Sequence, residues 1–344
     1  MNQTLHSPYF SAMHHMEFFL ASSQKKPHSL LSQGTKVLMY TLNRILCPTD
    51  FSDAALHAVR YAAFLAKNEH GHIKLLYVDE NEMDPLEYLM QDEKKKSERR
   101  KKVSAVAQQK FAELIERASL NPQSTSTHIH FGPAYHEIIQ EAEANRYAAV
   151  VIATEGLGHT SHHLLGRSVE RVVRLCRAPV ISIRPSDHVQ PWKIKTILCP
   201  TDFSEYANYA IPYAVSIARR YTAKIILLHT VDLTVQHPEL LVQNFPDLSL
   251  YHDHSKEIQV ERIVGRDIEP ENSIVRLAEE YEADLIIMGT HGARGMRRVQ
   301  IGNTTEEVVR RAQSPVLTIT HPVHKSIFPY RFNEEYTPQS PTSA

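Results

Sequence analysis

The sequence predicts an α/β protein built from two tandem copies of one domain, each with a five-stranded parallel sheet and flanking helices. The first observation is a repeat, because residues 45–52 (ILCPTDFS) return unchanged at 197–204, an offset of 152 positions. A match of this length between distant parts of one chain indicates duplication. The second observation is that short, unbroken apolar runs alternate with helical patterns, which is typical of parallel sheets covered on both faces.

In the second half, five short apolar stretches predict strands. They lie at 195–198, 224–228, 259–264, 285–288 and 316–319. Small apolar residues recur at helical spacing from Ala207 to Ala218, and two further helices are predicted at 274–281 and 304–312. Either Asp202 or Ser204 is expected to cap the first of these helices.

The first half repeats this order of elements. Strands are expected around Ile45 and at 73–78, 128–130, 150–153 and 180–183. A second landmark, two glycines separated by nine residues, matches between the halves at an offset of 136, so the first half has 16 extra residues between the landmarks. They fall in the highly charged segment 92–110, where we expect a lengthened surface helix, because surface connections tolerate insertion.

The repeat also sets the expected domain boundaries. Residues 39–186 and 193–321 are predicted as the two domains, and 1–38 and 322–344 as flexible tails. The first tail matches nothing in the second half, which leaves Met1 and Met39 as alternative start positions.

Composition narrows the class of partner and the compartment. The 38 basic and 39 acidic residues give no general attraction to DNA or to an anionic membrane surface. No apolar run approaches the ~20 residues that span a bilayer, and the first 20 residues lack the pattern of a secretory signal. Three cysteines form no disulfide framework, and we expect Cys47 and Cys199 to be packed at strand ends. A cytoplasmic location is therefore expected.

A glycine pattern in the second half points to phosphate binding. Gly289, Gly292 and Gly302 follow one predicted strand and open one predicted helix. Glycine lets backbone N–H groups approach phosphate oxygens, and a helix start favours negative charge. The alternative is that these glycines only form tight turns. The spacing is that of neither a P-loop nor a dinucleotide fingerprint.

Together with the Pro-Thr-Asp strand end, this pattern resembles the universal stress protein family, over residues 42–185 and 193–321. The resemblance implies a flavodoxin-like or Rossmann-like fold of the adenine nucleotide alpha-hydrolase type. It also implies ATP binding, with Mg²⁺ or another divalent ion, and two domains packed as a pseudo-dimer, with a homodimer as a further option.

Carried across residue by residue, the resemblance places ten residues of the second half around ATP. On the adenine and ribose side, the resemblance places the Pro-Thr-Asp end of one strand together with Thr230, where the family usually has valine. Near the ribose and phosphates, it places the end of another strand and the start of the helix that follows the glycines. Asn303 stands where the family commonly has Ser or Thr. These residues are Pro200, Thr201, Asp202, Thr230, Met288, Gly289, Gly292, Gly302, Asn303 and Thr304.

The first half departs further from the family pattern. Ala153 replaces the first glycine, Glu155 puts an anion on the phosphate side, and Arg167 follows Gly166 where a small polar residue is usual. We therefore expect the second half to bind nucleotide better. The weaker candidates in the first half are Pro48, Thr49, Asp50, Val78, Gly156, Gly166 and Ser168.

Other functions receive less support from the residues. No nucleophile, base and orienting group stand together, so we expect at most slow ATP hydrolysis, or autophosphorylation on Thr304, Thr305 or Ser168. A nucleotide-independent scaffold is a further alternative, with an unknown protein partner or RNA on the basic run 94–102, although a solvated helix face explains that run.

A metal-binding stress protein is the remaining alternative, because the chain has 21 histidines. No recognised ligand spacing is present, and scattered surface histidines are the expected interpretation. The candidate groups are His128 with His130 and His136, His159 with His162 and His163, and His252 with His254.

Overall fold

The computed structural model describes residues 40–80, 93–155, 165–185, 191–248, 258–292 and 303–322. The chain divides into two compact units, Met1–Leu38 and Met39–Ala344, and every described residue belongs to the second. The predicted tail at 1–38 lies outside the described residues, as does nearly all of the one at 322–344. The expected domain boundaries stay predictions.

The first half contains five strands and the helices between them. Its elements are β1 (Arg44–Pro48), α2 (Asp53–Glu69), β2 (His72–Asp79), α4 (Glu93–Arg117), the short 3₁₀ helix η1 (Pro122–Ser124), β3 (Thr125–Phe131), α5 (Ala134–Ala144), β4 (Ala149–Ala153), α6 (Arg167–Leu175) and β5 (Val180–Ile183).

The second half follows the same order. Its elements are β6 (Thr196–Pro200), α7 (Glu205–Asn208), α8 (Ile211–Tyr221), β7 (Lys224–Val231), the 3₁₀ helix η2 (Pro238–Asn244), β8 (Val260–Arg266), α9 (Pro270–Glu280), β9 (Leu285–Gly289), α10 (Asn303–Arg311) and β10 (Val316–Ile319).

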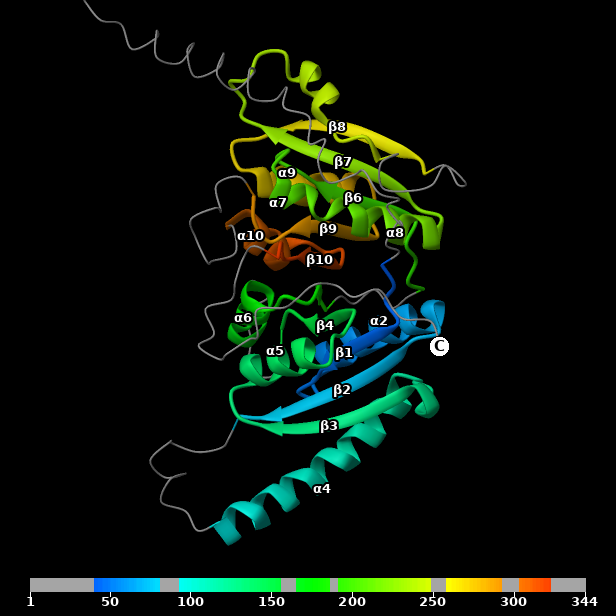
Figure 1. Ribbon diagram of the computed structural model, residues 1–344, viewed down its shortest axis with the longest axis vertical. Helices are drawn as coiled ribbons and strands as arrows, with labels where there is room; N and C mark the ends of the chain where they lie inside the picture. Colours follow the sequence, from blue (N-terminus) through cyan, green and yellow to red (C-terminus); the bar gives the residue numbers. More distant parts are fainter. Residues whose placement is uncertain are drawn as a thin grey trace, which may run out of the picture. The chain divides into compact units, whose positions relative to one another are not determined.

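The strands of each half form a parallel sheet, in the order β3-β2-β1-β4-β5 and β8-β7-β6-β9-β10. The predicted fold class is confirmed. The two sheets are also joined, because β5 and β10 pair antiparallel, with Leu317 opposite Ile181, to give one ten-stranded sheet (Figure 1). Antiparallel pairing of two equivalent edge strands is what a local two-fold axis produces.

Helices cover both faces of the sheet. On one face, α2, α4 and α8 enclose a buried cluster that includes Tyr61 and Ile217. On the other, α5, α6, α9 and α10 enclose a second cluster that includes Val172 and Val308. The inner strands, such as β4, β6 and β9, are buried on both sides, which is why continuous apolar runs in the sequence form them, whereas the edge strands β3 and β8 stay partly exposed.

One predicted helix is divided in two. The apolar pattern from Ala207 to Ala218 predicts a single helix, but α7 ends at Asn208 and α8 begins at Ile211. Pro212 occupies the first turn of α8. Proline has no N–H to donate to the carbonyl four residues earlier, so the helix is interrupted there and begins again.

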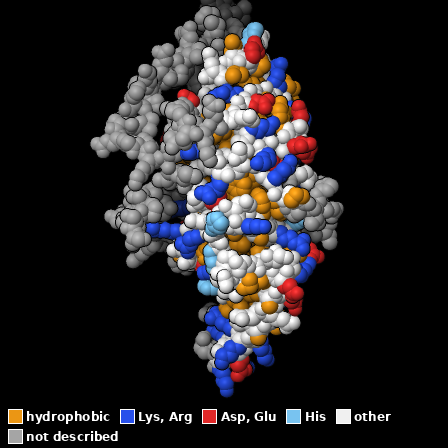
Figure 2. Space-filling view, turned by 90° about the vertical axis from the view of Figure 1, so that its right-hand side faces the viewer, with side chains coloured by type: hydrophobic (Ala, Val, Ile, Leu, Met, Phe, Trp, Pro, Cys, Tyr) orange, Lys and Arg blue, Asp and Glu red, His pale blue; other side chains and the backbone are white. Residues whose placement is uncertain are grey.

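The charged insertion of the first half forms a helix, as expected. Helix α4 has 25 residues, and Figure 2 shows basic and acidic side chains interspersed, including at the lower end of the view, where Figure 1 places α4. Arg99 donates to the buried Asp79 at 2.8 Å, so at least one residue of the basic run has a structural partner. No helix among the described residues is long and apolar enough to cross a membrane.

The three cysteines are buried, as expected for Cys47 and Cys199, and all three are 0% exposed. Burial raises the pKa of Cys199 to about 12 and raises the pKa values of Cys47 and Cys176 further. A thiolate is disfavoured in an apolar interior, which makes these thiols poor nucleophiles.

We predict that an aromatic disulfide reagent at mildly alkaline pH leaves all three thiols of the native chain unmodified. The same reagent should titrate three thiols once the chain is unfolded in denaturant. Absorbance of the released thiolate measures both. Rapid labelling of a thiol in the native chain would contradict the burial of these residues.

Candidate functional site

The turn after the first strand of each half is held by a threonine hydroxyl. The amide of Phe51 donates to Thr49 Oγ1 at 3.0 Å, and the amide of Phe203 donates to Thr201 Oγ1 at 2.9 Å. Threonine hydroxyls stabilise turns in this way. The repeated threonine therefore has a structural role in both halves, whatever it does for a ligand.

Phenylalanine occupies an uncommon backbone conformation at this turn, with φ of 65° at Phe51 and 64° at Phe203. Packing holds it there, since the ring of Phe51 lies 4.9 Å from the ring of Tyr77, and the ring of Phe203 stacks 4.0 Å from that of His229. The turn directs the phenylalanine into the core and leaves the preceding aspartate at the carboxyl end of the sheet.

The aspartate uses one carboxylate oxygen for the turn. Asp50 Oδ1 accepts from the Ser52 amide at 2.9 Å and from its hydroxyl at 2.5 Å, and Ser52 Oγ accepts from the Ala55 amide and caps α2. Asp202 and Ser204 repeat this arrangement, at 3.0 and 2.5 Å. Ser204, not Asp202, supplies the cap of its helix, which resolves the two options left by the sequence.

The glycine loop approaches the second oxygen of Asp202. A Cβ built on Gly292 would lie 2.4 Å from Asp202 Oδ2, and one on Gly289 would lie 2.9 Å from the carbonyl oxygen of Tyr206. Any larger residue would displace its neighbour at either position. The two sequence landmarks of the second half, the Pro-Thr-Asp turn and the glycine loop, therefore meet at the carboxyl ends of β6 and β9.

The helix start after the loop is fixed to the strand end. Thr305 Oγ1 donates to the Gly289 carbonyl oxygen at 3.0 Å, and Thr305 is 4% exposed. Thr304 Oγ1 donates to Glu271 Oε2 at 3.1 Å, while Asn303 is exposed at the first position of α10. Gly302 lies outside the described residues. From the sequence, Thr305 is a candidate only for autophosphorylation, and its burial argues against that role.

The remaining candidates of the second half line the same edge of the sheet. Pro200 ends β6, and Met288, 5% exposed, lies next to the last residue of β9. In β7, the buried hydroxyl of Thr230 has no hydrogen-bond partner in the described part of the chain. Buried hydroxyls are rarely left unpaired, so an orphaned one at a strand end suits contact with a ligand.

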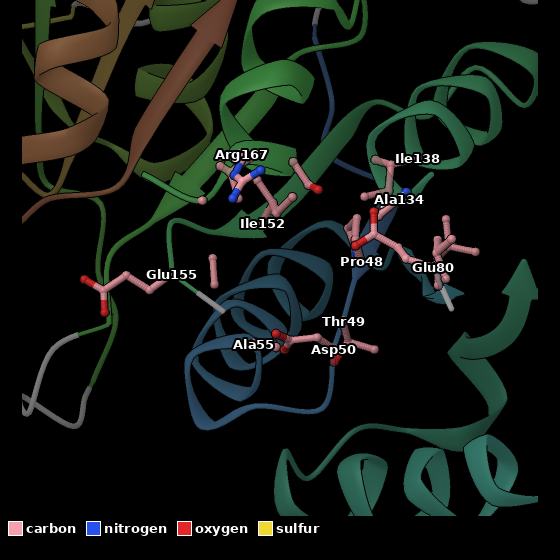
Figure 3. A pocket seen from close by; sticks show the side chains of 16 residues that line it. Pro48, Thr49, Asp50, Ala55, Glu80, Ala134, Ile138, Ile152, Glu155 and Arg167 are labelled. Atoms are coloured by element: carbon pink, nitrogen blue, oxygen red, sulfur yellow. Dashed lines mark hydrogen bonds between the residues drawn. The ribbon is translucent and has the colours of Figure 1, made fainter. Parts of the chain in front are cut away.

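The first half has a defined cavity of about 390 Å³ at the equivalent place (Figure 3). This is large enough for a small ligand. Six of the seven weaker candidates line it, and the seventh, Gly156, lies outside the described residues. The six are Pro48, Thr49, Asp50, Val78, Gly166 and Ser168.

Charged side chains of both signs line this cavity. Arg167 and Glu155 both border it, and Figure 3 shows the carboxylate of Glu155 well apart from Arg167. Glu80, which no sequence motif marks, accepts from the Ala134 amide at 2.8 Å and so caps the start of α5. Arg167 directly follows Gly166, so its position in the sequence already indicated that it lies near the site. From the sequence alone we interpreted it only as a departure from the family pattern.

Comparison with known proteins identifies the duplicated domain. The universal stress protein family matches twice, over residues 41–184 and 193–320, which together make up most of the chain. Universal stress protein MJ0531 of Methanocaldococcus jannaschii is 31% identical over 144 residues, covering 37% of this chain and 83% of that protein. Universal stress protein Slr1230 of Synechocystis is 23% identical over 299 residues, covering 80% of this chain and 99% of that protein.

Solved structures agree on the fold. A universal stress protein from Archaeoglobus fulgidus has a TM-score of 0.59 and 24% identity, covering 81% of this chain and 98% of its own. A universal stress protein solved in complex with cAMP matches 37% of this chain and 98% of its own, with 21% identity and a TM-score of 0.30, and the cyclic nucleotide is a ligand of that protein.

We predict that Thr305→Val destabilises the chain by about 1–3 kcal/mol, because it leaves the buried Gly289 carbonyl without this donor. Thr305→Ser keeps the hydroxyl and should cost only about 0.8 kcal/mol for the lost methyl group. Urea denaturation followed by circular dichroism measures both. Equal stability of the two variants would mean that the hydrogen bond contributes nothing.

Proposed function

We propose that this chain, which belongs to the universal stress protein family, binds ATP with a divalent ion and acts in stress response or signalling, with the nucleotide held mainly by its second half. The observation that carries the proposal is the close approach of Gly292 to Asp202 Oδ2. This approach places the Asp202 carboxylate, which can face a ribose or base, next to the glycine loop, which suits phosphate groups.

The two sides of this site offer different chemistry. On the base side, the orphaned hydroxyl of Thr230 can donate to or accept from a ring nitrogen or an amino group. On the phosphate side, the first N–H groups of α10 have no partners within the helix and, with the helix dipole, favour an anion. A divalent ion bound with the nucleotide is held chiefly by phosphate oxygens, with few ligands from the protein.

The cavity of the first half supports a second, weaker nucleotide site. Arg167 supplies a cation at its rim, while Glu80 and Glu155 add negative charge that opposes a triphosphate. At an effective dielectric constant near 20, two like charges 4 Å apart repel by about 4 kcal/mol. We therefore expect the first half to accept adenine nucleotides with lower affinity than the second.

A signalling role is favoured over metabolic catalysis. The two acidic residues in the first turns of α10, Glu306 and Glu307, both pair with Arg310, at 2.7 and 2.8 Å. Their position suits helix stabilisation, since acidic residues near a helix start are favourable. We therefore expect any turnover of ATP to be slow.

The protein's proposed location is the cytoplasm. Its buried, unpaired thiols suit a reducing compartment.

Calorimetric titration of Mg-ATP into metal-stripped protein tests the nucleotide site. We expect micromolar binding at about one site in the unmodified chain, and loss of that binding in Gly292→Val and Gly302→Val. The valine at 292 must displace the Asp202 carboxylate. Circular dichroism confirms that each variant is folded.

The matched control is Gly166→Val, which changes the first-half equivalent of Gly302. It should leave the tighter binding unchanged. If Gly166→Val abolished binding while Gly302→Val preserved it, the principal site would be in the first half. If the folded, unmodified chain bound no ATP at all, a nucleotide-independent scaffold would be the better explanation.

A further inference from the structure

The first half has a cluster of charged and polar side chains where the second half has no charged residue. The cluster lies between the sheet and α5, next to the cavity wall formed by Ala134 and Ile138. Its members are Lys74 on β2, His128 and His130 on β3, Glu137 and Glu141 on α5, and Tyr147 just before β4.

Strand register and helix position identify the equivalent residues of the second half. Lys74 pairs with Leu46 as Ile226 pairs with Leu198, and His128 pairs with Leu76 as Ile263 pairs with Leu228. In the order Lys74, His128, His130, Glu137, Glu141 and Tyr147, the equivalents are Ile226, Ile263, Gly265, Ser273, Leu277 and Ala283.

This comparison shows that the fold does not need the polar set. The second half makes the same elements with no charged residue at these places, and a Cβ on its Gly265 would lie 2.4 Å from Ser273 Oγ, so a histidine there would require Ser273 to move. Burying charged groups costs free energy unless they are paired, and apolar replacements are often as stable or more so. A cluster kept in one copy alone therefore calls for a functional reason.

Three side chains of the cluster converge on one point. The ligand atoms of His128, His130 and Glu141 all lie within 4.8 Å of one another, and His130 Nε2 is 3.7 Å from Glu141 Oε2. Ligands of a tetrahedral zinc ion at about 2.0–2.1 Å from the metal stand roughly 3.3 Å apart. Small side-chain movements would close the remaining difference.

The surroundings orient one of these histidines for coordination. His130 Nδ1 lies 3.1 Å from Glu137 Oε2, which leaves Nε2 directed at Glu141. A carboxylate on the far ring nitrogen is the usual partner of a metal-ligating histidine. Glu137 Oε1 in turn contacts His136 Nδ1 at 3.1 Å, so His136 supports the carboxylate and is not one of the converging groups.

A protein cation now occupies part of this position. Lys74 Nζ lies 2.9 Å from Glu141 Oε1 and 3.3 Å from His128 Nδ1. Glu141 and His128 are two of the three converging residues, so an ammonium bound to them competes with a metal ion. Lys74 is 15% exposed and His128 is exposed, which gives the ammonium a way out and an ion a way in.

From this geometry we propose that the first half contains a Zn²⁺ site formed by His128, His130 and Glu141, with Glu137 orienting His130 and Lys74 as a displaceable competitor. Two imidazoles and a carboxylate are a donor set that suits zinc, and three protein ligands leave the fourth position to water. The site is separate from the nucleotide proposal. The sequence grouped His128 and His130 with His136. The proposed site uses the first two, and Glu141 takes the place of His136 as the third ligand.

Co²⁺ and Zn²⁺ binding to the full-length, untagged, metal-stripped chain tests the site. Visible absorption of Co²⁺ reports a low-coordinate nitrogen and oxygen site, and competition with a chromophoric chelator gives the Zn²⁺ affinity. We expect His128→Asn with His130→Asn to remove the Co²⁺ absorption and one equivalent of tight Zn²⁺. Glu137→Gln should weaken Zn²⁺ binding about 10-fold or more, because it removes the carboxylate that orients a metal-ligating histidine.

Two variants copy the second half. Lys74→Ile removes the competing cation and should tighten Zn²⁺ binding by about 10-fold or more, as expected from the loss of a nearby positive charge. Lys74→Ile with Glu141→Leu carries the residues found at Ile226 and Leu277, so it should stay folded and lose the site. Thermal denaturation monitors folding in each case.

The control for other histidines is His162→Asn with His163→Asn, which lie in another histidine group of the sequence and outside the described residues. This variant should keep the Co²⁺ spectrum of the unmodified chain. The proposal is overturned if the His128 and His130 double variant retains that spectrum and its Zn²⁺ affinity, or if folded Lys74→Ile binds Zn²⁺ no better than the unmodified chain.

Discussion

The interaction on which both halves depend is the turn closed by one aspartate oxygen at the end of their first strand. Asp50 Oδ1 and Asp202 Oδ1 each accept two hydrogen bonds from the serine that caps the next helix. The turn holds the phenylalanine between the aspartate and the serine in a positive-φ conformation, packed against the core. Because a single residue links strand, helix and core, the aspartate carboxylate has a fixed place at the edge of the sheet where parallel α/β proteins bind ligands.

Duplication allowed the two copies of this scaffold to diverge in chemistry without a change of fold. The second half brings Gly292 against its aspartate, and the first half has a cavity bordered by Arg167 and a partly exposed polar cluster beside it. The backbone order and the register of the strands are the same in both. The residues that differ between the copies are therefore not required by the fold, because each copy shows which residues the fold can do without.

The pairing of β5 with β10 makes the two copies one sheet. Leu317 and Ile181 face each other there, both fully buried, and Thr318 Oγ1 donates to the Val180 carbonyl at 3.2 Å. A salt bridge at 3.0 Å between Glu69 of α2 and Arg220 of α8 adds a second connection. Each edge strand protects the other from unwanted pairing, which an exposed edge would invite.

The sequence by itself determined the duplication, the order of the strands and helices, and the residues at the strand ends, since hydrophobic periodicity and repeated motifs are local signals. It did not reveal that Thr305 ties α10 to Gly289, or that Glu141 joins His128 and His130. Those facts depend on side chains brought together from distant elements. Spacing along the chain carries no information about such contacts until the sheet places the strands side by side, and only the tertiary structure decided them.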